Sequence, residues 1–131
     1  MKYWFTTFVI LTGLLTANHS VKAQQAKAYE TIYYRARAGN LLFLLNYADG
    51  YIGASQIKVW QSGQKALVFL PESGAAENNG DFKFYPKQRG SKDSIILTHI
   101  NEEEIVPAFI RARYRAKGKL IPLLFKRSNK Q

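Results

Sequence analysis

The sequence predicts an all-β protein, a small antiparallel eight-stranded meander barrel preceded by a signal peptide. Short runs in which apolar and polar residues alternate recur along the chain, separated by turns that contain Gly, Pro, Asn or Asp. None of the connections is long enough to hold a crossover helix. Residues 34–45 and 114–124 resemble each other, as expected if the first and last hairpins of a closed barrel meet. Internal duplication and convergence of two short basic hairpins both explain that likeness.

The first 23 residues have the three-part order of a secretory signal peptide. Met1 and Lys2 form a basic start, residues 3–17 are apolar, and a polar segment ends in Val21-Lys22-Ala23. An apolar run of about 15 residues falls short of the ~20 that a membrane-spanning helix needs, and a retained anchor is the alternative. We expect cleavage after Ala23, a single domain over residues 24–131, and a periplasmic or secreted protein that is not transmembrane once the signal peptide is removed.

Eight strands follow from local patterns in the mature chain. In the first of them, apolar residues alternate with Arg35 and Arg37, which gives the strand one apolar and one basic face. The seventh strand alternates in the same way. We place the strands at residues 29–38, 41–47, 51–60, 65–70, 81–85, 93–100, 108–116 and 120–125.

Turn and breaker residues predict the connections between these strands. Asp49-Gly50 predicts a tight hairpin turn, and the small residues 53–55 predict a bend or bulge. Pro122 predicts an edge or a bulge in the last strand. The one plausible helix covers residues 101–106, with Asn101 as its N-cap and a following proline that limits it to one or two turns.

The domain is strongly basic and contains no cysteine. The full chain carries a formal charge of +10, and about +8 remains once Lys2 and Lys22 leave with the signal peptide. Without cysteine the domain has no disulfide, no cysteine zinc site and no thiol chemistry. For an exported protein we expect an anionic lipid, a glycan or an acidic protein as partner, and no nucleic acid. A solvated basic surface that only keeps the protein soluble is the alternative.

Alternating basic residues on the first and seventh strands predict a basic patch on the outside of the barrel. If the two similar hairpins meet, their basic side chains form one surface with Tyr33 in its middle. Arginine forks match the geometry of phosphate and carboxylate groups. Glu30 or the acidic residues 102–104 are expected to neutralise part of the charge. The candidate ligand- or anion-binding residues are Arg35, Arg37, Arg111, Arg113, Arg115 and Lys117, with Lys119 beside them.

The sequence offers little for catalysis or metal binding. His99 is the one histidine of the mature chain, and a lone strand histidine is more often structural than a general base. The sequence has no paired histidines, no calcium-loop spacing and no phosphate-binding glycine loop. We therefore expect a protein that is not an enzyme, with no cofactor and no metal site.

Three stretches carry a resemblance to a known family. They are residues 41–50, Leu-Leu-Phe-Leu-Leu-Asn-Tyr-Ala-Asp-Gly, residues 69–84 with their Asn-Gly-Asp-Phe, and the closing hairpin 114–124. With them, the layout of residues 34–127 resembles the lipocalin-like N-terminal barrel of bacterial copper-resistance (envelope stress) lipoproteins. That family carries a lipidated cysteine and a Cys-x-x-Cys pair, which this chain lacks. The resemblance therefore implies fold and compartment, and not the family's cysteine chemistry.

Two kinds of function follow from these features. The first is an exported binding module, which holds a hydrophobic or amphipathic ligand in the barrel or docks on an anionic envelope surface. A solidly packed interior would argue against a ligand held inside the barrel. The alternative is a protein-interaction or inhibitor protein of the cell envelope, with the irregular segment 71–80 and Trp60 as its contact.

Overall fold

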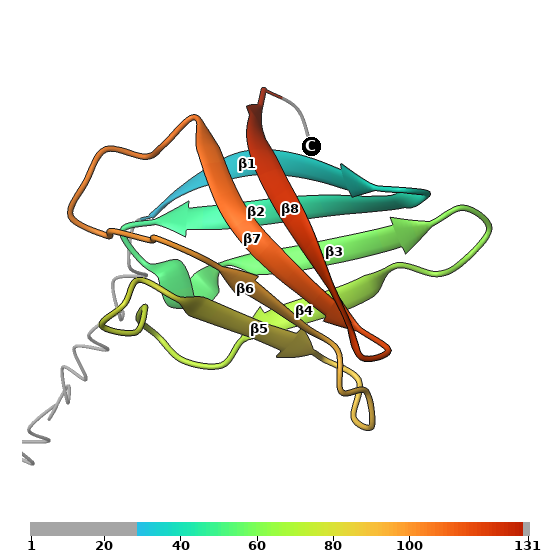
Figure 1. The fold of residues 1–131 in the computed structure, drawn as a ribbon. Coiled ribbons are helices and arrows are strands. Elements are labelled where there is room, and N and C mark those ends of the chain that lie inside the picture. The colour runs from blue at the N-terminus through green and yellow to red at the C-terminus, as the bar shows by residue number, and fades with distance from the viewer. Residues whose placement is uncertain (1–28, 130–131) are drawn as a thin grey trace, which may run out of the picture.

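In the computed structural model, which describes residues 29–129, eight strands close into one antiparallel barrel (Figure 1). The strands follow one another around the barrel in chain order, which confirms the predicted meander. The predicted signal peptide and its cleavage site lie outside the described residues. The strands are β1 (Glu30–Ala38), β2 (Leu41–Asp49), β3 (Gln56–Gln61), β4 (Leu67–Pro71), β5 (Phe82–Pro86), β6 (Ser94–Leu97), β7 (Phe109–Ala116) and β8 (Lys119–Ser128).

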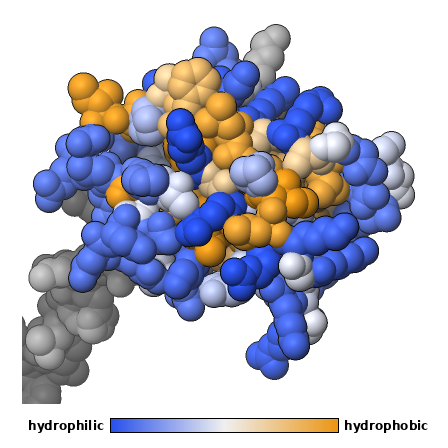
Figure 2. All heavy atoms as spheres, viewed as in Figure 1, coloured by the Kyte–Doolittle hydropathy of each residue, from blue (hydrophilic) through white to orange (hydrophobic). Residues whose placement is uncertain are grey.

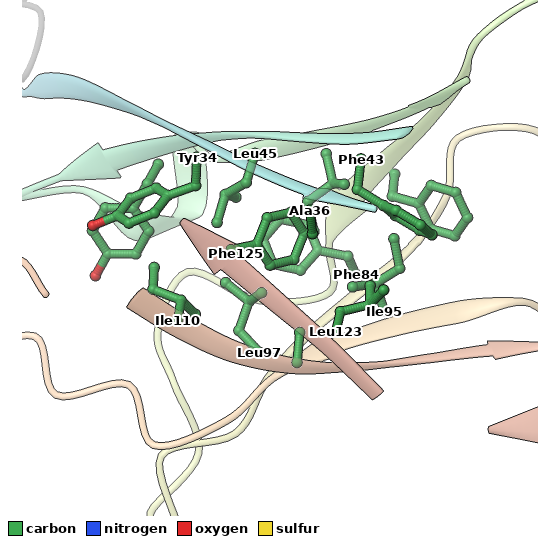
Figure 3. Close-up of a cluster of buried hydrophobic side chains, with 14 of the residues drawn as sticks. Tyr34, Ala36, Phe43, Leu45, Phe84, Ile95, Leu97, Ile110, Leu123 and Phe125 are labelled. Carbon is green, nitrogen blue, oxygen red and sulfur yellow. The ribbon is translucent and has the colours of Figure 1, made fainter. Parts of the chain in front are cut away.

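Apolar side chains from all eight strands fill the barrel, as the strand alternation predicts. Phe43, Phe69, Phe84 and Phe125 have no exposed surface, and Figure 3 shows the labelled side chains of this core pointing toward one another. The ring centroid of Phe43 lies 5.1 Å from that of Tyr114 and 6.5 Å from that of Phe125, both edge to face. Edge-to-face pairs of this kind add to the free energy gained by burying the rings. The interior of the described barrel is therefore a packed core.

A short seam between β1 and β8 closes the barrel. Residues 33–35 of β1 pair with residues 126–128 of β8, and β8 reaches Ser128, beyond its predicted end at residue 125. Away from the seam the two strands diverge, so that β8 runs across β1 at a steep angle (Figure 1). Pro122 lies in the part of β8 that pairs with β7 alone, which confirms the predicted edge position. Its missing N–H is tolerated there because β1 forms no ladder with it.

The connection after Asp49 differs from the predicted tight hairpin. A 3-10 turn, η1 (Ile52–Ala54), separates β2 from β3, which begins at Gln56 instead of residue 51. The turn packs against the β4–β5 loop, where a Cβ on Gly53 would approach the Gly74 Cα to 3.0 Å. The predicted bend at residues 53–55 is confirmed. The predicted two-residue hairpin at Asp49-Gly50 is wrong, because the β2–β3 connection includes this 3-10 turn, which packs closely against the β4–β5 loop.

The predicted helix over residues 101–106 is absent. The segment forms a single turn, in which the Asn101 side chain accepts a hydrogen bond from the Glu103 N–H at 3.1 Å. Asn101 thus caps the turn as expected, but Ile105 is 95% exposed and offers no apolar face to pack. A helix of one or two turns does not overcome the cost of nucleation without such packing. Within residues 29–129, no helical segment has the length and apolar character that a membrane crossing requires.

Tyr34 joins β1 to the β6–β7 connection from inside the barrel. Its hydroxyl donates a hydrogen bond to the Pro107 carbonyl at 2.7 Å, and burial raises the pKa of Tyr34 to about 12. Burial likewise raises the pKa of Tyr47, whose ring lies 6.2 Å from that of Tyr34, to about 12. Both phenols therefore bind their protons more tightly in the folded than in the unfolded state, where the pKa is about 10.

We expect Tyr34→Phe to lower the free energy of unfolding by about 1 kcal/mol at neutral pH, because the Pro107 carbonyl loses its donor. In the wild type, the contribution of the buried Tyr34 phenol to the free energy of unfolding should be fully present below pH 10. It should decrease as the pH rises toward 12, since the unfolded state releases the phenol proton first. Urea unfolding between pH 10 and pH 12 should show a smaller decrease in the free energy of unfolding for Tyr34→Phe than for the wild type. Tyr85→Phe, at an exposed tyrosine, should have the stability of the wild type. An equal loss of stability in both variants would contradict a specific role for the hydrogen bond from Tyr34 to Pro107.

Candidate functional site

All six predicted anion-binding side chains are exposed on the barrel. Arg111, Arg113 and Arg115 form one row along β7, and Arg35 and Arg37 form a second row on β1. The spacing of two explains both rows, because alternate residues of a strand point to the same face. Lys117 lies in the turn between β7 and β8, and Lys119 opens β8. All of these side chains thus face outward, as the sequence pattern predicts.

An exposed apolar strip on β8 separates the two basic rows. The register sets each β7 arginine directly opposite an apolar residue, pairing Arg111 with Leu124, Arg113 with Pro122 and Arg115 with Leu120. Leu120 is 53% exposed and Leu124 is 44% exposed. Phe109, at the start of β7, continues the strip and is 55% exposed. Figure 2 shows hydrophobic side chains gathered over β7 and β8, with hydrophilic ones on both sides. We call the strip and the two rows together the amphipathic face.

The two rows do not merge into the single patch that the sequence predicted. At the seam Arg35 lies opposite Lys126, which lies opposite Phe109 on the other side. Beyond that level β1 and β8 separate, and Arg37 is not paired with β8. Tyr33 lies at the end of the seam, beside Ser128, and not in the middle of the basic residues.

The sequence analysis missed the apolar strip and Lys126. The signal was present in residues 120–126, where Leu120, Pro122, Leu124 and Lys126 take alternate positions. Reading that run as a continuous apolar strand obscured the fact that half of these side chains face outward. The alternation predicts the strip once the opposite positions, Leu123 and Phe125, are assigned to the core.

One arginine of the amphipathic face is neutralised within the protein. The Arg113 Nη2 donates to the Asp81 Oδ2 at 3.2 Å, so Asp81 supplies neutralisation that was expected from Glu30 or residues 102–104. Within residues 29–129, Arg37, Arg111 and Arg115 form no salt bridge or side-chain hydrogen bond. Their positive charge is therefore available to a partner.

The other candidates remain apart from this face or from each other. Trp60 is half-buried near the end of β3, whereas Gly74 of segment 71–80 packs against Gly53, before the start of β3. Trp60 and segment 71–80 were predicted as the contact for a protein partner, and the structure places them at different parts of the β3 hairpin. His99 is exposed just after β6, at the border of the amphipathic face. Among the described residues, no three His, Cys, Asp or Glu side chains gather as metal ligands would.

The fold and the site define the protein as a closed antiparallel β-barrel with a packed interior and an amphipathic outer face. No protein-family model matches the chain, and no curated protein or solved structure is significantly similar to it.

Proposed function

We propose that this protein is an exported, non-enzymatic binding module that docks on an anionic lipid surface of the cell envelope through its amphipathic face. The register of β7 and β8 carries the proposal, because it sets each of the three β7 arginines beside an apolar residue. Such a face suits the boundary between lipid headgroups and acyl chains, where arginines bind phosphate and apolar side chains leave water. The signal-peptide pattern supports a periplasmic or secreted location, where such surfaces are found.

The apolar strip separates this proposal from a basic surface that only keeps the protein soluble. Single exposed apolar side chains are ordinary, whereas a continuous apolar strip between charged residues marks an interaction site. Leu120, Leu124 and Phe109 are each about half exposed and lie on neighbouring strands. Solubility gives no physical reason for such a strip, while a lipid surface does.

The packed interior favours docking over carriage of a ligand inside the barrel. Phe43, Phe69, Phe82, Phe84 and Tyr114 are each at most 5% exposed and come from four different strands and both halves of the chain. A lipocalin-like ligand site needs space among such side chains, whereas here the rings contact one another. We therefore place the amphipathic ligand on the outside of a lipocalin-like barrel.

We expect the protein to co-sediment with vesicles that contain phosphatidylglycerol, and not with pure phosphatidylcholine vesicles. Replacing both Leu120 and Leu124 with serine should weaken binding roughly ten-fold, because the apolar contribution to docking is lost. The matched control replaces Leu70 and Tyr85, two exposed side chains that lie opposite each other on β4 and β5, and should bind as the wild type does.

Equal binding to neutral and anionic vesicles would contradict the proposal. Stoichiometric capture of one envelope protein, without lipid binding, would instead support the protein-interaction alternative. Raising the salt concentration should weaken vesicle binding, because screening shortens the reach of the arginine charges to within about 10 Å at 0.1 M.

A further inference from the structure

Two hollows, one at the rim of the barrel and one on its outer face, meet at Thr98, His99 and Arg111. The first, of about 450 Å³, lies between β7 and the β6–β7 connection, and the second, of about 760 Å³, lies over β7 and β8 beside Asp81. Both volumes fall in the range of small-molecule sites. The first is lined mainly by apolar side chains, Ile100, Ile105, Pro107, Phe109 and Ile110.

The backbone holds His99 at the junction in an unusual conformation. The Thr98 N–H donates to the Arg111 carbonyl at 2.9 Å, and the Ile100 N–H donates to the Gly80 carbonyl at 2.8 Å. The backbone thus pairs with β7 before His99 and with the β4–β5 loop after it, and His99 itself takes a φ of +57°. This change of partner also ends β6 at Leu97, before its predicted end at residue 100. Left-handed backbone at a residue other than glycine costs on the order of 1 kcal/mol, and such residues cluster at binding sites.

The glycine at position 80 allows the β4–β5 loop to lie close to the backbone of His99 and Ile100. A Cβ at residue 80 would lie 3.1 Å from the His99 Cα and 3.1 Å from the Ile100 nitrogen. The loop that contains Gly80 also supplies Asp81, which binds Arg113 at 3.2 Å. The junction is therefore built by contacts between the β4–β5 loop, the end of β6 and β7.

The junction presents two side-chain hydrogen-bond donors, one of them a guanidinium cation, that have no acceptor within the described protein. Asp81 is occupied by Arg113, and within residues 29–129 neither the Arg111 guanidinium nor the His99 ring has a salt-bridge or hydrogen-bond partner. Glu104, on the β6–β7 connection, is the acidic residue that lines the first hollow. A guanidinium and an imidazole side by side suit an oxygen anion such as a phosphate or a carboxylate.

We propose that this junction binds one single-chain anionic amphiphile. Its phosphate or carboxylate headgroup contacts Arg111 and His99, and its hydrocarbon chain lies in the first hollow against Ile100, Phe109 and Ile110. The site rests on the proposed docking function, because it shares Arg111 and Phe109 with the amphipathic face, and it gives that face a defined lipid subsite. The ligand lies at the rim of the barrel, where the core residues Tyr47 and Ile110 form part of the wall of the first hollow.

The test is a titration of the protein with dodecyl phosphate below its micelle concentration, followed by amide chemical shifts. We expect saturable shifts at Thr98, His99 and Arg111, and about ten-fold weaker binding in Arg111→Gln. His99→Gly should also weaken binding while leaving the melting temperature unchanged or higher, because glycine adopts a positive φ without strain. Arg115→Gln is the matched control, since Arg115 lies on the same face of β7 but lines neither hollow.

Two results would overturn the site. If inorganic phosphate binds as tightly as dodecyl phosphate, the hydrocarbon chain is not bound. If Arg115→Gln weakens binding as much as Arg111→Gln does, the amphiphile responds only to the general charge of the amphipathic face. Dodecanoate in place of dodecyl phosphate distinguishes a carboxylate from a phosphate headgroup, and binding of either one supports the site.

The site and the docking function fail in different experiments. Arg35→Gln with Arg37→Gln should weaken vesicle binding and leave the dodecyl phosphate titration unchanged, because neither residue lines the hollows. A protein that binds dodecyl phosphate at the junction but no vesicles refutes docking and retains the site. A protein that binds vesicles but shows no local shifts with dodecyl phosphate refutes the site and retains docking.

Discussion

Replacing Arg111, Arg113 and Arg115 together with serine is expected to weaken binding to phosphatidylglycerol vesicles on the order of 100-fold. Each arginine near an anionic lipid surface contributes about 1 kcal/mol, and 1.4 kcal/mol corresponds to a factor of ten in affinity. All three side chains are exposed along one row of β7, so one flat surface reaches them simultaneously. Vesicle co-sedimentation over a range of lipid concentrations measures the change.

The matched control removes the same charge from other parts of the barrel. Lys58, Lys65 and Lys87 lie on β3, in the β3–β4 connection and just after β5, and none of them belongs to the strip or the two rows of the amphipathic face. Their joint replacement with serine should change binding much less than the arginine variant does. Equal losses in both variants would show that net charge, and not this face, governs binding.

Replacing Phe43 with alanine is expected to lower the free energy of unfolding by about 3–5 kcal/mol. Phe43 has no exposed surface, and its ring contacts those of Tyr114 and Phe125, from the far end of the chain. The chain lacks cysteine, so no disulfide stabilises the barrel against the loss of this side chain. For a domain of this size such a loss approaches the whole stability. Urea unfolding followed by tryptophan fluorescence measures it.

Leu70→Ala provides the comparison at an exposed position of β4, where we expect a change within about 0.5 kcal/mol. A variant Phe43→Leu keeps most of the apolar volume and should lose less than Phe43→Ala does. A loss in Phe43→Ala no larger than that in Leu70→Ala would mean that the barrel interior is not a packed core.

Local pattern predicted most of the fold. The alternation of β1 and β7 follows from residues two apart, which must face the same side whatever the rest of the chain does. The β7–β8 hairpin was predicted with a three-residue turn at 117–119, whereas the structure has a two-residue turn, Lys117-Gly118, with φ values of +50° and +75°. The shorter turn shifts the register by one residue from the predicted one, and it thereby sets Arg113 opposite Pro122.

The local predictions that were wrong have a common cause in tertiary contacts. Asp49-Gly50 does not form a tight hairpin, because Gly53 packs against Gly74 of a distant loop. Residues 101–106 do not form a helix, because of their two aliphatic side chains only Val106 packs against the core, whereas Ile105 is 95% exposed. Neither the approach of Gly53 to Gly74 nor the exposure of Ile105 leaves a periodic signal in the sequence.

The sequence alone was sufficient for the strands, their order and the outward direction of the arginines, since these depend on alternation and short turns. The tertiary structure decided how those arginines lie relative to one another. The short β1–β8 seam and the divergence beyond it place an apolar strip between the two rows. The pairing of Asp81 with Arg113 and the position of His99 beside Arg111 likewise join segments far apart in the chain. Such contacts arise from the closure of the whole barrel, which no local spacing encodes.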